Sequence, residues 1–152
     1  MLVGETWAEC GGAVAWDGKD AGAAPQVRES APKVMQAISR AIKARKILAC
    51  HDLSEGGLCA AAAEMAIGGG FGVRIDPATV PTGEAIERTD VVLFSESPSR
   101  FLLEVAPDTD LQLDVPHAAI GEVIAEPQLD YGAFQLSLDE AREAFFVWER
   151  KL

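Results

Sequence analysis

Residues 51–76, HDLSEGGLCAAAAEMAIGGGFGVRID, contain the pattern that decides the predicted fold. Polar side chains and two glycines come first, an alanine-rich segment follows, and a glycine tract leads into alternating apolar and polar residues. Apolar side chains recur at helical spacing from Leu58 to Met65, which predicts a helix that the glycine tract ends. The alternation over residues 71–76 predicts a half-buried strand. The stretch therefore predicts a polar turn, a helix and a strand in succession.

The polar residues ahead of this helix allow two interpretations. Asp52 and Ser54 are both good helix N-cap residues, and Asp52 with Glu55 has the spacing of a capping box. Alternatively, Gly56 and Gly57 leave backbone N–H groups free at a helix N-terminus, where the helix dipole favours an anion such as phosphate. The two acidic side chains oppose that anion unless they bind a cation or face elsewhere. The residues alone leave both interpretations open.

A second polar turn follows the apolar run 91–94, which predicts a short strand. Glu96 lies between Ser95 and Ser97, and Arg100 follows closely. In a structural interpretation Glu96 pairs with Arg100 and the serines cap the turn. In a functional interpretation Ser95, Glu96 and Ser97 present hydrogen-bonding groups to a sugar or an amide.

The remaining pattern predicts one α+β domain over residues 1–152, with a mixed β-sheet covered by helices. Ser30 is expected to cap one helix, and Ser137 with Glu140 forms a capping box for the last helix. The buried stripe of that helix is predicted to include Leu138, Ala141, Phe145 and Trp148. Residues 17–26 are predicted to form a loop and residues 84–88 a helical turn. Further strands are predicted at residues 2–4, 13–16, 47–50, 101–106, 120–125 and 131–136.

Composition narrows the classes of function. The net charge of −11, from 24 acidic and 13 basic side chains, opposes binding to nucleic acid or to an anionic membrane. Three cysteines without a CxxC pair, and only two histidines, argue against a disulfide framework or a zinc site and favour a reducing cytoplasm. The spacing around His51 and His117 gives no catalytic triad. No catalytic or metal-binding residue is therefore assigned.

The two polar turns together resemble a known family. HDLSEGGL with AAAEMAIGGGFGVRID, and then LFSESPSRFLLEV, is similar to the C-terminal domain of the aminoimidazole ribonucleotide synthetase superfamily. Within it, the second half of the phosphoribosylformylglycinamidine synthases is the most similar group. The opening LVGETWAECGGA resembles the stretch with which that domain begins, although Cys10 and Ala13 stand where the family usually has leucine and serine.

The resemblance implies a piece of an ATP-dependent carbon–nitrogen ligase of purine biosynthesis, which uses ATP, magnesium and ammonia from glutamine. The start of the chain in mid-fold supports an excised domain, inactive alone, whose partners are an N-terminal nucleotide-binding domain, the first half of the enzyme and a glutaminase. Both turns are then expected at one edge of the sheet, facing a shared open groove that holds a nucleotide substrate. The ligand-cleft candidates are Asp52, Ser54, Gly56, Gly57, Ser95, Glu96, Ser97 and Arg100.

Two alternatives belong to other classes. The chain is also similar to selenophosphate synthetase, thiamine-phosphate kinase and the hydrogenase-maturation carbamoyl dehydratase, which share the superfamily. The turn LFSESPSRF favours the purine enzyme over these relatives. The other alternative is a free-standing binding or interaction domain.

Overall fold

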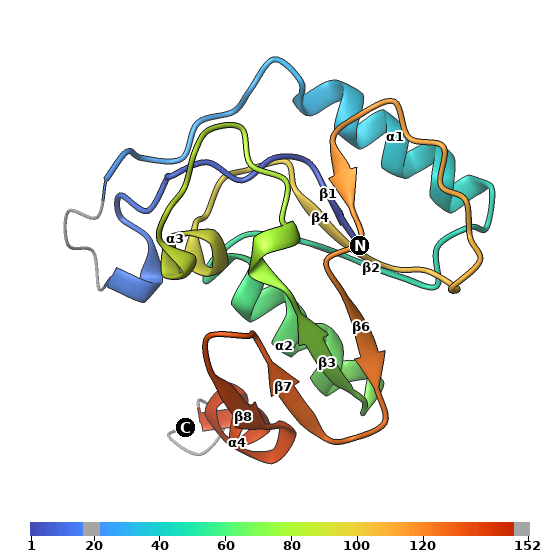
Figure 1. Ribbon diagram of the computed structural model, residues 1–152. Coiled ribbons are helices and arrows are strands. Elements are labelled where there is room, and N and C mark those ends of the chain that lie inside the picture. Colours follow the sequence, from blue (N-terminus) through green and yellow to red (C-terminus); the bar gives the residue numbers. More distant parts are fainter. Residues whose placement is uncertain (17–21, 148–152) are drawn as a thin grey trace.

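The first of two β-sheets contains the N-terminal strand of the chain at its centre. The computed structural model, which describes residues 1–16 and 22–147, places four strands in this sheet in the order β2-β4-β1-β5, all antiparallel (Figure 1). Asp52 at the end of β2 pairs with Phe101 at the start of β4. The strands are β1 (Leu2–Val3), β2 (Ala49–Asp52), β4 (Phe101–Glu104) and β5 (His117–Ala118).

The second sheet is mixed. Its order is β6-β3-β7-β8, in which β3 and β7 run parallel and the other neighbours are antiparallel. The predicted α+β class is confirmed, but the strands form two sheets and not the single mixed sheet expected from the sequence. The strands are β3 (Gly72–Ile75), β6 (Gly121–Ile124), β7 (Gln128–Asp130) and β8 (Gln135–Ser137).

Helices cover both faces of the first sheet and pack against the second. Helix α1 lies on one face of the first sheet, and α2 lies between the two sheets (Figure 1). The helices are α1 (Ala31–Lys43), α2 (Gly57–Gly69), α3 (Thr89–Phe94) and α4 (Leu138–Phe145), with 3-10 turns η1 (Val14–Trp16) and η2 (Pro77–Thr79).

Neighbouring residues of the first sheet enter two different cores because side chains of a strand alternate between its faces. Leu2 and Leu102 pack with α2 and the second sheet. Val3 and Leu103 pack with α1 on the opposite face. Both faces are covered, so β4 buries consecutive leucines where an open sheet would bury every second residue.

Capping residues and glycines in the sequence correctly predicted several helix ends. Gly70 ends α2 in a left-handed conformation, with φ of 74°, and donates its N–H to the Ala66 carbonyl. Ser137 and Glu140 form the predicted capping box of α4. Ser30 precedes α1 as predicted, but its backbone is already helical and its side chain makes no capping hydrogen bond.

Four predicted elements are wrong in whole or in part. Residues 13–16 form the 3-10 turn η1, and residues 91–94 lie in helix α3 because Val91, Val92 and Leu93 are buried and α3 packs on α2. Residues 131–134 form the turn between β7 and β8, where Asp130 Oδ1 accepts from the Gly132 N–H. The helical turn predicted at residues 84–88 does not form.

Two predicted apolar stripes are only partly buried. Phe71 precedes β3 and is 55% exposed, whereas Ile75 is buried as predicted. On α4, Leu138 and Ala141 are buried but Phe145 is exposed. Trp148, predicted to continue this stripe, lies outside the described residues, as do residues 17–21 of the predicted loop.

Candidate functional site

The two predicted polar turns lie against each other in the structure. The first joins β2 to α2, and the second joins α3 to β4. The Gly56 N–H donates to Glu96 Oε1 at 2.9 Å, so the predicted proximity of the turns is confirmed. We call residues 52–57 and 95–100 together the polar hinge.

Strand pairing and one glycine bring the turns together. The end of β2 lies beside the start of β4, so the turn after β2 lies beside the turn before β4. Gly57, with φ of 61°, then packs on the backbone at the end of α3. A Cβ on Gly57 would overlap the Ser95 carbonyl oxygen and lie 2.9 Å from the carbonyl carbon of Phe94. Only glycine therefore allows this close approach.

Glu96 caps α2 from a distant part of the sequence. Its Oε1 accepts from Gly56, the N-cap residue of α2, and at 3.0 Å from the N–H of Val14 in η1. The predicted local capping by Asp52 and Ser54 is wrong: the helix begins later, and Ser54 contributes its backbone oxygen to the Gly57 N–H. Because Gly56 and Gly57 both donate internally, their N–H groups are not free for an anion.

Ser95 and Ser97 are buried and hold the segment that follows β1. Ser95 Oγ donates to the Trp7 carbonyl at 2.7 Å, and the Trp7 N–H donates to Ser97 Oγ at 3.0 Å. The two hydroxyls also lie 2.9 Å apart. Their exposures of 0% and 1% correct the expectation that these side chains face an open groove.

Arg100 is a fully buried cation that binds backbone and hydroxyl oxygens. Nε donates to the Ser97 carbonyl at 2.8 Å, Nη2 to the Ser95 carbonyl at 2.6 Å and Nη1 to Thr6 Oγ1 at 2.9 Å. Burial lowers the pKa of Arg100 to about 10, while the negative charge of nearby Glu9 opposes that shift. The predicted Glu96–Arg100 ion pair is not found among the described residues.

A second buried charge lies next to this cluster. Glu9, 2% exposed, forms an ion pair with Arg28, whose guanidinium lies 4.2 Å from the centroid of the Trp7 ring. Ser95 Oγ and the Glu96 N–H also contact the Glu9 carbonyl. No local pattern marks Glu9, because it meets the second turn only through tertiary packing, 86 positions along the chain from Ser95. Arg28 joins this cluster only through Glu9 and Trp7.

Three of the candidate side chains remain accessible to solvent. Asp52 and Ser54 are exposed, and Glu96 is half-buried. His51, beside them, contacts the Asp52 carbonyl through Nδ1 at 2.6 Å and Glu64 through Nε2 at 2.9 Å. Both ring nitrogens of His51 are therefore held by neighbouring groups. No group of three or more His, Cys, Asp or Glu side chains suited to a metal occurs in residues 1–16 and 22–147.

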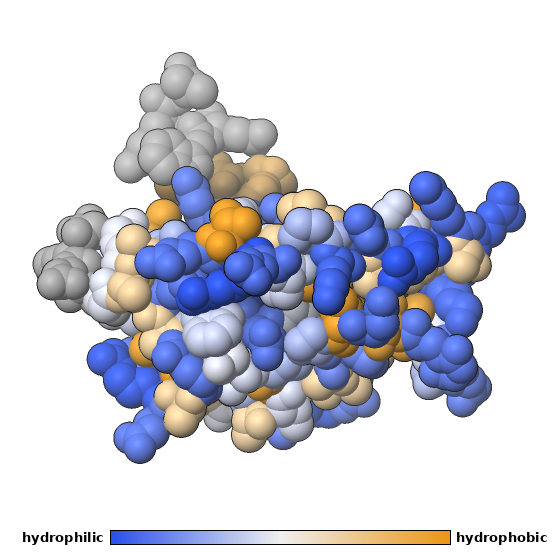
Figure 2. All heavy atoms as spheres, turned by 90° about the horizontal axis from the view of Figure 1, so that it is seen from above, coloured by the Kyte–Doolittle hydropathy of each residue, from blue (hydrophilic) through white to orange (hydrophobic). Residues whose placement is uncertain are grey.

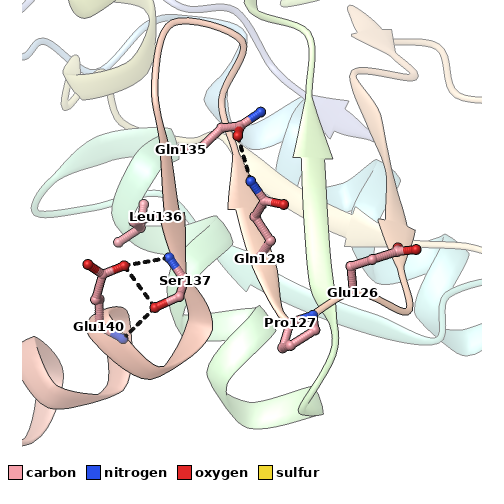
Figure 3. Close-up of a pocket in the computed structure, with 7 residues that line it drawn as sticks. All are labelled: Glu126, Pro127, Gln128, Gln135, Leu136, Ser137 and Glu140. Atoms are coloured by element: carbon pink, nitrogen blue, oxygen red, sulfur yellow. Dashed lines mark hydrogen bonds between the residues drawn. The ribbon is translucent and has the colours of Figure 1, made fainter.

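Two cavities lie elsewhere on the surface. One, of about 640 Å³, lies between the sheets over the C-terminal half of α2. The other, of about 410 Å³, is a shallow depression at the N-terminus of α4 (Figure 3). There Ser137 and Glu140 satisfy each other, and Gln128 donates to Gln135 at 2.6 Å (Figure 3). None of the eight candidate residues lines either cavity.

The visible surface is mostly hydrophilic, as the charged composition predicts, and the cysteines are protonated thiols. Figure 2, seen from above the view of Figure 1, shows a mostly hydrophilic face with apolar side chains in separate groups. Burial raises the pKa of the Cys10, Cys50 and Cys59 thiols, which keeps them protonated at neutral pH. Within the described part of the chain, no helix is long and apolar enough to cross a membrane.

Comparison with known proteins relates this chain to one family. The family described as AIR synthase related protein, C-terminal domain, matches residues 1–132. The phosphoribosylformylglycinamidine synthase subunit PurL of Methanosarcina acetivorans is 39% identical over 154 aligned residues, covering 95% of this chain. The PurL subunit of Alkaliphilus metalliredigens is 37% identical and covers 100% of it. The chain spans 21% of the length of each relative.

Solved structures show the same fold. T. maritima PurL complexed with FGAR superposes with a TM-score of 0.75 at 19% identity, covering 92% of this chain and 27% of that chain. T. maritima PurL complexed with ATP gives a TM-score of 0.70 at 20% identity, covering 92% and 24%. The PurLQS structure from the same organism gives 0.66 at 21% identity, covering 90% and 24%.

Proposed function

Because this chain belongs to the AIR synthase related protein family, as a C-terminal domain, we propose that it forms the C-terminal domain of the second half of a phosphoribosylformylglycinamidine synthase. The single observation that carries the proposal is the alignment with a PurL subunit, 39% identical over 95% of this chain. The shared fold of T. maritima PurL supports it. Fold alone would not do so, since one fold serves many functions.

The parent enzyme would convert formylglycinamide ribonucleotide into its amidine in the cytoplasm. ATP transfers its γ-phosphoryl group to the amide oxygen of the substrate. Ammonia derived from glutamine then adds to the carbon of that amide and expels phosphate. Such chemistry depends on positioning and charge neutralisation more than on a protein nucleophile. The remainder of the enzyme, with a glutaminase, would supply the sites for ATP, magnesium and ammonia.

The described residues of this chain do not fit a magnesium site, since they hold no group of three suitable ligands. We therefore assign no step to this domain and infer that it is inactive alone. Its part is a rigid wall of a ligand cleft. In this proposal the accessible groups Asp52, Ser54 and Glu96 face that cleft. The buried Ser95, Ser97 and Arg100 support them, and Gly56 and Gly57 allow the two turns to meet.

A chimera tests the proposed function. This chain replaces the matching segment of the PurL subunit of Methanosarcina acetivorans, and amidine formation is assayed with ATP, magnesium and free ammonia. We expect turnover clearly above that of the same subunit with the segment deleted. The proposal fails if the chimera is folded and binds ATP but turns over no faster than the deletion.

The role of the accessible hinge is tested in the same chimera. Asp52→Asn and Ser54→Ala should raise KM for the ribonucleotide substrate severalfold if the hinge faces the cleft. Asp139→Asn is the matched control, because Asp139 is an exposed carboxylate on α4 outside the hinge. Unchanged kinetics in both hinge variants would remove them from the cleft while leaving the assignment of the domain intact.

A further inference from the structure

The groove between the two sheets is separate from the polar hinge. It lies over the C-terminal half of α2, whereas the hinge lies at the N-terminus of that helix. Its volume of about 640 Å³ falls in the range of pockets that hold small molecules or cofactors. Two continuous segments form its walls, residues 102–107 at the end of β4 and residues 119–123 entering β6.

One wall ends in an edge strand. Within the described residues, β6 pairs with β3 alone and forms one edge of its sheet (Figure 1). An edge strand carries backbone N–H and C=O groups that no neighbouring strand uses, and these can pair with an added strand. Val123 on this strand is 49% exposed.

The groove is bordered by large apolar side chains left in water. Leu48 is 66% exposed and Phe71 is 55% exposed, and both line the groove together with Val123. Their location around one hollow distinguishes them from single apolar residues scattered on a surface. An occupant with apolar side chains would remove this area from water.

Charge determines which occupant fits. The charged side chains among the lining residues are Glu104 and Glu122, and both are acidic. The amino group of Met1, which also lines the groove, donates to the Leu103 carbonyl at 2.9 Å, and burial lowers its pKa. Arg74 forms an ion pair with Glu122, whereas Glu104 has no ion pair within residues 1–16 and 22–147. The chain carries a net charge of −11, which opposes a second copy of itself. A basic partner is favoured.

We propose that this groove binds an extended segment of another protein chain, in which apolar side chains alternate with basic ones, and that the segment adds to the second sheet as a strand beside β6. The apolar side chains would pack against Val123 at this edge. The basic side chains would lie near Glu104. The backbone of the segment would pair with the free edge of β6.

Binding of fluorescein-labelled peptides tests the proposal. The probe alternates valine with lysine, and the control peptide has glutamate in place of lysine. Fluorescence anisotropy should show saturable binding of the basic peptide and binding weaker by about tenfold or more for the acidic one, with the difference reduced by added salt. Equal binding of both peptides, or binding of neither, would overturn the proposal.

Amide hydrogen exchange separates strand addition from apolar contact alone. The basic peptide should slow exchange within residues 121–124 of β6, and binding without that protection contradicts the proposed geometry. Val123→Asp should abolish binding, and Val123→Thr, which keeps a β-branched side chain, should weaken it. Val27→Asp is the control, since Val27 is exposed outside the groove. Sedimentation that shows a dimer of this chain, dissociated by Val123→Asp but not by Val27→Asp, would also overturn the proposal.

Discussion

Gly57 allows the two turns of the hinge to pack closely, because it has no side chain. We predict that Gly57→Ala lowers the free energy of unfolding by about 2 kcal/mol or more, and Gly57→Val by more still, because a Cβ would overlap the Ser95 carbonyl in an already left-handed backbone. Denaturant unfolding measures the loss.

Gly12 provides the matched control for this prediction. Its φ of 79° is also left-handed, but a Cβ there would meet no atom within 4 Å. Gly12→Ala should therefore report the backbone cost alone, about 1 kcal/mol. If the two alanine variants lose the same stability, close packing against Ser95 is not what requires Gly57.

Glu96 is the residue that decides whether α2 is capped locally or from a distance. Glu96→Ala leaves the N–H groups of Gly56 and Val14 without their acceptor and should lower the free energy of unfolding by about 1–3 kcal/mol. Glu55→Ala removes an exposed carboxylate near the same helix end. It should lower the free energy of unfolding by at most a few tenths of the loss caused by Glu96→Ala. Equal losses of stability in chemical denaturation would indicate that residues next to the helix, and not Glu96, cap α2.

Tyr131 is the lone tyrosine of the chain, so its ionisation can be followed directly. Burial raises the pKa of its hydroxyl, which donates to the Cys59 carbonyl at 2.7 Å. In the unfolded chain the group ionises near pH 10. The folded state therefore holds the proton where the unfolded state releases it, so stability is lost as pH rises above about 10.

We predict that tyrosinate absorbance stays low above pH 10 until the chain unfolds, and titrates near pH 10 in denaturant. Tyr131→Phe should lose about 1 kcal/mol at neutral pH with the hydrogen bond, and the difference should shrink at high pH. A tyrosinate signal that develops near pH 10 in the folded chain would contradict the burial argument.

Among the elements, α4 tests how far a local cap stabilises a helix. Ser137 Oγ accepts from the Glu140 N–H at 3.1 Å, and the Glu140 carboxylate accepts from the Ser137 N–H at 2.8 Å. Ser137→Ala should lower the free energy of unfolding by about 1 kcal/mol. Ser30→Ala is the matched control, since Ser30 precedes α1 without a capping bond, and it should be nearly neutral. The opposite order would contradict the capping geometry.

Helix α3 shows an element that tertiary packing determines. Its apolar residues favour a strand by local propensity, and the sequence predicts one. In the structure Val91, Val92 and Leu93 are buried and α3 packs on α2, with Asp90 accepting from the Val91 N–H in the first turn. Six residues are too short for periodicity to separate a helix from a strand.

At the scale of the whole molecule, we predict that the isolated chain makes no amidine. It spans 21% of its PurL relatives, and its described residues hold no metal-binding group. The measurement is amidine formation with ATP, magnesium and ammonia, with a complete PurL subunit as positive control. Turnover above the uncatalysed background would show that this domain contains chemistry that we assign to the rest of the enzyme.

Sequence alone determined the features that depend on neighbours along the chain. The capping box of Ser137 and the glycine end of α2 follow from backbone groups a few residues apart, so local rules predicted both. The family resemblance rested on two motifs, residues 51–76 and 93–105, and the match over residues 1–132 confirms it. The expectation that the two turns lie at one edge of a sheet is confirmed as far as their proximity, since the Gly56 N–H donates to Glu96.

Only the tertiary structure decided how the meeting turns use their side chains. Glu96 replaced the local cap of α2, and Ser95, Ser97 and Arg100 turned inward, where they bind Trp7 and Thr6 of the segment after β1. The reason is physical: a buried polar group is satisfied by the partners that folding brings within hydrogen-bond distance. For Glu96, Ser97 and one nitrogen of Arg100 these partners include groups 40 to 94 positions away along the chain, whereas the other two Arg100 nitrogens bind carbonyls of their own turn. The spacing of residues along the sequence does not indicate which distant residues the fold will bring together.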